Sequence, residues 1–149
     1  MAALSAKFTL TRPSEPVLIL PASLRAQLLT EARAAFPAEC CGLLEGVRDG
    51  DDAKVTAIHP SPNLSPEPKT AFELDPAVHF ALLRALQGTR RAVVGCYHSH
   101  PTGKAVPSQR DRANGCETGF VWIIIATGVI DVLEAFHGPD FEPLAIESA

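Results

Sequence analysis

Residues 92–111 read AVVGCYHSHPTGKAVPSQRD, and this stretch carries most of the information about fold and chemistry. Its first part, residues 92–97, has the apolar composition of a buried strand and leads directly into His98 and His100. Residues two apart on a strand point to the same face, so both imidazoles can converge on one point. Asp111 follows a loop rich in glycine and proline and one turn of a predicted helix, so its carboxylate can fold back toward the histidines.

These three side chains form a candidate zinc site. Catalytic zinc takes three protein ligands and keeps a fourth position open for water, and two imidazoles with one carboxylate are a common set. Ser108 begins the predicted helix three residues before Asp111, so the two share a helix face and the hydroxyl lies beside the metal. There it could donate to an oxyanion. Taken singly, the histidines could be exposed and Ser108 a simple N-cap, but the combined order favours the metal site.

A proton carrier must come from elsewhere in the chain. Zinc lowers the pKa of its water to about 7, but a base must still take the proton and return it to the leaving amine. Glu39 stands at the entrance to the apolar run 40–44, directly after a predicted helix stop at Pro37. Position alone does not select Glu39 over Glu45 or Glu73.

The remaining pattern predicts a single α/β domain over residues 1–149, with residues 1–16 as a loose lead-in. Helices are predicted at 23–36, from Pro76 (capped by Asp75) to Gly88, and from Ser108. The prolines of residues 60–69 predict a loop. Strands are predicted at residues 17–20, 40–44, 55–59, 72–74, 92–97, 121–126 and 130–136. Strands and helices mixed in this order predict a sandwich built on one sheet.

The motifs together resemble those of the JAMM (MPN+) zinc metalloprotease family, in its small stand-alone prokaryotic type. The matching segments are ECCGLLEG at 39–46, HSHP at 98–101 and SQRD at 108–111, and the resemblance extends from about residue 17 to 146. It implies an MPN domain, similar to the cytidine deaminase sandwich, with a central mixed sheet flanked by helices. It also implies one Zn²⁺ held by His98, His100 and Asp111, with Glu39 as the general acid/base and Ser108 steadying the tetrahedral intermediate. Deaminase signatures and the HExxH zinc-peptidase motif are absent from the sequence.

The resemblance also implies a substrate and leaves alternatives open. The expected reaction is hydrolysis of the amide bond after the C-terminal Gly-Gly of a ubiquitin-like or sulfur-carrier protein, by processing or deconjugation. An extended Gly-Gly tail can add to a sheet edge, which we expect near residues 60–69 and 72–74. The alternatives are a non-catalytic MPN scaffold subunit and a zinc hydrolase of small amides. Neither the particular carrier nor the oligomeric state follows from the sequence.

Composition limits the classes of partner and the cellular compartment that we expect for this chain. The formal charge is −4, and the chain has no basic cluster longer than Arg90-Arg91, which disfavours nucleic acid. No apolar run approaches the roughly 18 residues of a membrane span, so we expect no membrane partner and a cytoplasmic protein. The four cysteines include an adjacent pair, a poor start for disulfides, so we expect reduced thiols, with Cys40, Cys41 and Cys96 in the core. The remaining histidines are expected to be structural or exposed, and the tryptophan to lie in the core: His59, His79, His137 and Trp122.

Overall fold

The computed structural model describes residues 15–115, 117–128 and 131–148. Most of the predicted lead-in, residues 1–14, lies outside them, as does Ile130 at the start of a predicted strand. The elements in chain order are β1 (Val17–Ile19), α2 (Ala22–Ala35), β2 (Cys41–Asp49), β3 (Asp52–Ser61), α3 (Pro76–Leu86), β4 (Ala92–His100), α4 (Gln109–Ala113), β5 (Val121–Ala126), β6 (Val132–His137) and β7 (Glu142–Glu147).

The strands form one mixed sheet in the order β1-β3-β2-β4-β5-β6-β7, which confirms the predicted sheet with helices around it. Most neighbours are antiparallel, whereas β4 and β5 run parallel. The sheet closes into a barrel because β1 pairs in parallel with β3 on one side and β7 on the other. The sequence did not predict this closure, which depends on a strand of only three residues.

The helices begin and end within two residues of the predicted positions. The α2 helix ends just before Pro37, and Leu28 and Ala32 are its buried residues. The side chain of Asp75 caps α3 by accepting a hydrogen bond from the Ala77 amide, and Pro76 occupies the first turn. No helix of the described residues is long and apolar enough to cross a membrane.

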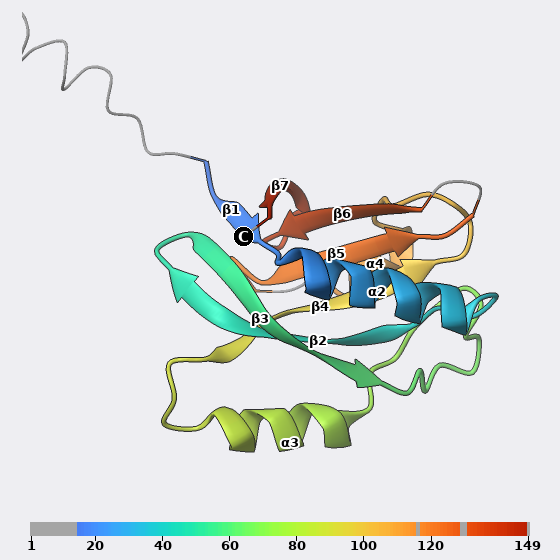
Figure 1. The fold of residues 1–149 in the computed structure, drawn as a ribbon. Helices are drawn as coiled ribbons and strands as arrows, with labels where there is room; N and C mark the ends of the chain where they lie inside the picture. Colours follow the sequence, from blue (N-terminus) through green and yellow to red (C-terminus); the bar gives the residue numbers. More distant parts are fainter. Residues whose placement is uncertain (1–14, 116, 129–130, 149) are drawn as a thin grey trace, which may run out of the picture.

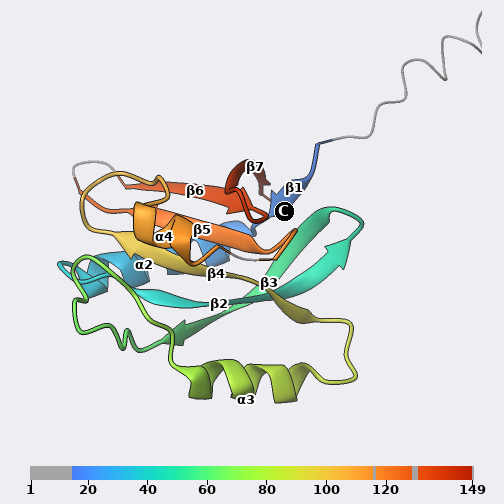
Figure 2. The ribbon, with the colours of Figure 1, turned by 180° about the vertical axis from the view of Figure 1, so that it is seen from behind.

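Two apolar clusters lie on opposite sides of the central strands, and β5 contributes to both because its six residues are all buried. Ile123 and Ile125 belong to the cluster that contains the buried residues of α2. Trp122 and Ile124 belong to the cluster that contains Leu82 of α3. The α2 helix lies in front of the sheet in Figure 1 and α4 lies in front of it in the reverse view of Figure 2, so the two helices cover opposite faces.

Three details differ from the sequence-based prediction. Residues 72–74 form no strand, and Leu74 makes only an isolated bridge with Asn63. The strand β7 was not predicted, because Pro143 lacks a donor N–H and only Leu144 and Ile146 supply the alternation of a strand. The predicted loop at residues 60–69 begins two residues later than expected, since β3 extends to Ser61.

Candidate metal centre

The histidine pair lies at the carboxyl end of β4, beside the carboxyl end of its parallel neighbour β5. His100 is opposite Ala126, the last residue of β5. The ends of parallel strands are a common place for binding sites, because the side chains there project beyond the sheet into open space. The imidazole of His98 is fully buried, and that of His100 nearly so.

The predicted ligand atoms converge on one point. His98 Nε2 lies 3.0 Å from His100 Nε2 and 3.1 Å from Asp111 Oδ2, and the His100–Asp111 distance between the same atom types is 3.2 Å. Ligands about 2.05 Å from a tetrahedral zinc ion are separated by about 3.3 Å, so this triangle has the size that zinc requires. The donor set of two imidazoles and one carboxylate also suits zinc. The residues therefore fit the metal that the sequence predicts.

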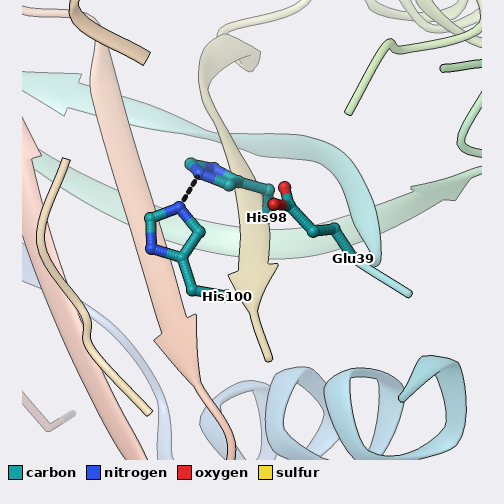
Figure 3. A group of neighbouring side chains, drawn as sticks. All are labelled: Glu39, His98 and His100. Atoms are coloured by element: carbon teal, nitrogen blue, oxygen red, sulfur yellow. Dashed lines mark hydrogen bonds between the residues drawn. The ribbon is translucent and has the colours of Figure 1, made fainter. Parts of the chain in front are cut away.

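Glu39 stands beside this triangle at the start of β2. A carboxylate oxygen of Glu39 lies within 4.8 Å of ring nitrogens of His98 and His100. Figure 3 shows the two imidazoles facing each other while the Glu39 side chain approaches from a separate backbone segment. Glu39 could thus complete a wider metal group, but the three atoms with Asp111 are much closer together. This geometry favours Asp111 as ligand and leaves Glu39 free to handle protons.

Hydrogen bonds orient one histidine and the aspartate. His100 Nδ1 lies 3.0 Å from the Lys104 carbonyl, so Nδ1 carries the proton and the Nε2 lone pair faces the candidate metal position. Asp111 accepts from the Ser108 amide at 2.9 Å, while Ser108 Oγ accepts from the Asp111 amide at 3.0 Å. This reciprocal capping box holds the Asp111 carboxylate in place at the first turn of α4.

His98 is held by rings rather than by a second hydrogen bond. Its Nδ1 is buried and has no hydrogen-bond partner among the described residues. The Phe72 ring stacks on the imidazole with a centroid distance of 4.3 Å, and Trp122 meets it edge-on at 5.7 Å. These aromatic contacts fix the plane of the ring and exclude water from one of its faces.

Burial and mutual contact set the protonation of the three residues. Burial raises the pKa of Asp111, but the hydrogen bonds with His100 and His98 outweigh it and hold that pKa far below its usual range. Burial lowers the pKa of His98, which favours the neutral imidazole that a metal requires. Burial also opposes the charge on His100, yet its contacts with Asp111 and the Lys104 carbonyl raise its pKa overall.

The carboxyl group of Glu39 is poised near neutrality. Burial raises its pKa to about 7, an effect that the nearby His100 partly offsets. A general acid/base works best when its pKa lies near the working pH, because it must both take and return a proton. Among the acids that the sequence left open, Glu45 is paired with Arg91 and His59, and Glu73 is exposed.

Comparison with known proteins places this architecture in a family. The family described as prokaryotic homologs of the JAB domain matches residues 21–137. The chain belongs to this family. The match confirms the JAMM/MPN resemblance predicted from the three motifs.

Relatives of this JAB domain cover most of its length. A desampylase from Haloferax volcanii is 37% identical over 133 residues, which span 87% of this chain and 94% of the relative. A probable TtuB-protein conjugate cleaving protease from Thermus thermophilus is 40% identical over 99 residues, 64% of this chain and 61% of that protein.

Solved structures agree with the fold of this JAB domain. A Desulfitobacterium hafniense protein solved in solution superposes with a TM-score of 0.75 at 29% identity, over 89% of this chain and 94% of that one. A JAB1/MPN domain protein from Archaeoglobus fulgidus superposes at 0.59 with 19% identity, over 88% and 98%. The second likeness supports the MPN fold alone.

A groove lies beside the metal centre of the JAB domain, and the sequence predicted only part of its lining. It encloses about 560 Å³ next to the His98–Phe72 stack. Phe72, Glu73 and Leu74 form one wall, where the sequence placed the substrate edge. Asn114, Gly115, Glu117 and Phe120 line it from another segment, and the remaining lining residues are Leu43, His79, Cys96 and Trp122.

Two polar residues near Glu39 were not singled out from the sequence. Ser99 Oγ accepts from the Cys40 amide at 2.8 Å, and the Ser99 amide donates to the Cys40 carbonyl at 3.1 Å. Asn63 contacts the backbone carbonyl of Glu39 itself. No motif in the neighbouring sequence indicates these roles. A serine between two histidines and an asparagine in a proline-rich loop are both common patterns without a specific function.

The cysteines agree with their predicted role as core residues where they are described. Cys40 and Cys41 are free and buried, Cys96 is buried, and Cys116 lies outside the described residues. Burial raises the pKa of Cys40 to about 11 and that of Cys41 to about 12, so neither thiol is a nucleophile at neutral pH.

Proposed function

We propose that this protein is a zinc-dependent isopeptidase that cleaves the amide bond after the C-terminal Gly-Gly of a ubiquitin-like or sulfur-carrier protein. The observation that carries the proposal is the convergence of His98, His100 and Asp111 within 3.2 Å beside the acid Glu39. The Haloferax and Thermus relatives, a desampylase and a probable conjugate-cleaving protease, support the substrate class.

In this proposal the metal ligands and the acid/base are separate residues. His98, His100 and Asp111 hold one zinc ion. When bound, the ion supplies Lewis acidity, which lowers the pKa of water and polarises a carbonyl group. Glu39 takes the proton from the attacking water and returns it to the amine that leaves, a double role suited to a pKa of about 7.

Ser108 is proposed to steady the tetrahedral intermediate. In the capping box its Oγ accepts a hydrogen bond from the Asp111 amide, so the hydroxyl proton remains available to donate. The residue is exposed, which lets a substrate carbonyl approach it. Ser108 thus both caps α4 and is available as an oxyanion donor, the two roles that the sequence left open.

The groove beside Phe72 is proposed to hold the extended tail of the carrier. Its largely apolar lining suits an extended chain without bulky side chains, and residues 72–74 lie along it outside any strand. Glycines at the scissile end permit close approach to the buried histidines, since they lack a Cβ.

The test compares the wild type with Glu39→Gln, using Glu142→Gln on β7 as a matched control. Each protein is assayed for zinc and for cleavage of a Gly-Gly-tailed carrier fused through its C terminus. We expect one zinc per chain in all three and a loss of about 10²- to 10⁴-fold in kcat for Glu39→Gln alone. Zinc without cleavage of any carrier fusion would refute the peptidase and favour a scaffold. Cleavage of small amides only would favour the alternative hydrolase.

A second experiment tests the groove. Glu73→Lys reverses the one charge on the 72–74 wall, so we expect a changed KM for the carrier fusion with unchanged zinc content. Glu142→Lys is the control for the charge change. Equal KM values in the two variants would remove residues 72–74 from the substrate site.

A further inference from the structure

The side chain of Asn63 lies between three segments of the active-site region. Its Nδ2 donates to the Glu39 carbonyl at 3.1 Å and to the Ala71 carbonyl at 3.0 Å. Its Oδ1 accepts from the amides of Ser65 and Glu73, both at 3.0 Å. An asparagine amide has two donor hydrogens and two acceptor lone pairs, so all four are used, and this pattern also assigns which amide atom is nitrogen.

The first consequence concerns the backbone of Glu39. This residue precedes β2, so it lacks the ladder partners that hold the strand residues after it. Its amide donates instead to the Pro68 carbonyl at 2.7 Å, and its carbonyl accepts from Asn63. Both peptide groups of the proposed acid/base are therefore held by the loop that follows β3.

The second consequence concerns the wall of the groove. Asn63 binds Ala71 and Glu73, the residues on either side of Phe72. Phe72 stacks on His98, and the Glu73 carbonyl accepts from the Leu64 amide at 2.9 Å. One side chain therefore fixes the aromatic wall against the histidine and at the same time fixes the residue that carries the proton.

We propose that Asn63 is a positioning residue that couples the groove wall at residues 71–73 to the orientation of Glu39. Binding of a substrate tail against the wall then also orders the acid/base, through one amide group. This inference rests on the proposed function for its catalytic readout, but the coupling itself is a property of the protein without substrate. Asn63 touches neither the candidate metal nor the reacting bond, so its effect on catalysis is indirect.

The variants separate the donor half of the amide from the acceptor half. Asn63→Ala removes all four hydrogen bonds, whereas Asn63→Asp retains the acceptor bonds and faces two carbonyls with a carboxylate. Gln87→Glu makes the same amide-to-acid change at the exposed end of α3 and is the matched control. A misplaced catalytic group costs about 10²-fold in rate, so we expect kcat to fall by about 10- to 100-fold in both Asn63 variants with zinc retained. We also expect a raised KM in Asn63→Ala, where the wall is released as well.

Amide hydrogen exchange tests the coupling without any turnover. In the wild type, the amides of Glu39 and Glu73 should open with the same free energy, because one side chain secures both segments. Asn63→Ala should accelerate both together, and Gln87→Glu neither. Independent opening of the two amides in the wild type would overturn the proposal, even if the variants failed to fold.

The kinetic and hydrogen-exchange measurements distinguish failure of this inference from failure of the proposed function. Unchanged kcat and KM in a folded, zinc-loaded Asn63→Ala would overturn the positioning role while leaving the isopeptidase assignment intact. A wild type that cleaves no Gly-Gly fusion would refute the proposed function, and the exchange measurement would still decide whether Asn63 couples the two segments.

Discussion

Removing the hydroxyl of Tyr97 tests how the sheet beneath the metal centre is tied to α2. Tyr97 precedes His98 on β4 and is fully buried, and its hydroxyl donates to the Glu31 carboxylate at 2.8 Å and 2.9 Å. A hydrogen bond to a charged group contributes about 1.5–3 kcal/mol. Glu31 is only partly buried, so water replaces some of this, and we expect Tyr97→Phe to cost about 1–2 kcal/mol at pH 7.

The stability cost of Tyr97→Phe should depend on pH. Burial raises the pKa of Glu31, and the Tyr97 hydrogen bond partly lowers it again. A folded-state pKa above the unfolded value means that ionised Glu31 costs stability at neutral pH, a cost relieved as the pH falls through the folded pKa. In Tyr97→Phe the hydrogen bond no longer lowers the pKa of Glu31. The mutation should therefore cost the most stability at pH 7, and less as the pH falls toward 4.5, the ordinary pKa of a glutamate.

The assay is urea unfolding followed by the fluorescence of the single tryptophan, at pH 7 and pH 4.5, with and without Glu31→Gln. Glutamine keeps an acceptor for Tyr97 but cannot ionise, so in that background the cost of Tyr97→Phe should be smaller and independent of pH. The metal ligands titrate alike in all four proteins and cancel in the difference. A cost below about 0.5 kcal/mol at pH 7, or one equal at both pH values, would refute the reasoning.

Three further predictions concern the metal, a glycine in the core and the buried thiols. Chelation of zinc should lower the stability, and zinc at 100 times its Kd should restore about 2.7 kcal/mol, except in His98→Ala; no shift in the wild type would contradict the metal site. Gly42→Ala should destabilise the fold by about 1–3 kcal/mol, because its Cβ would lie 2.3 Å from the Tyr97 hydroxyl. Tyr97→Phe should not rescue it, since the Tyr97 Cζ would lie at 2.4 Å. Cys40 and Cys41 should resist thiol reagents at pH 8 until urea unfolds the chain, because burial raises their pKa values to about 11 and about 12; rapid labelling of the native protein would contradict their burial.

Features that depend on neighbours along the chain were predictable from the sequence. Two histidines at alternate positions of a strand share a face whatever the rest of the fold does. Ser108 and Asp111 cap their own helix, and Asp75 with Pro76 starts another, through contacts within three residues. The apolar run of β5 likewise marks a strand covered on both faces.

The surroundings of the three candidate acids depended on the tertiary structure. Sequence position left Glu39, Glu45 and Glu73 equivalent, and only the family resemblance favoured the first. In the fold, Glu45 is paired with Arg91 and His59, and Glu73 is exposed, while Glu39 lies beside the histidine pair with a raised pKa. Burial and pairing of this kind depend on strands that are distant in sequence.

Long-range pairing also decided how the sheet ends and how the site is held. The barrel closes because residues 17–19 pair with residues 145–147 near the other end of the chain, and three residues of strand carry no recognisable pattern of their own. Asn63 is similar, because its four partners come from segments between two and 24 residues away. The sequence by itself determined which residues could bind a metal and cap a helix, since that chemistry is local. Only the tertiary structure brings Glu39 beside them and Asn63 against its backbone, because hydrogen bonding and burial exist only once distant segments have packed together.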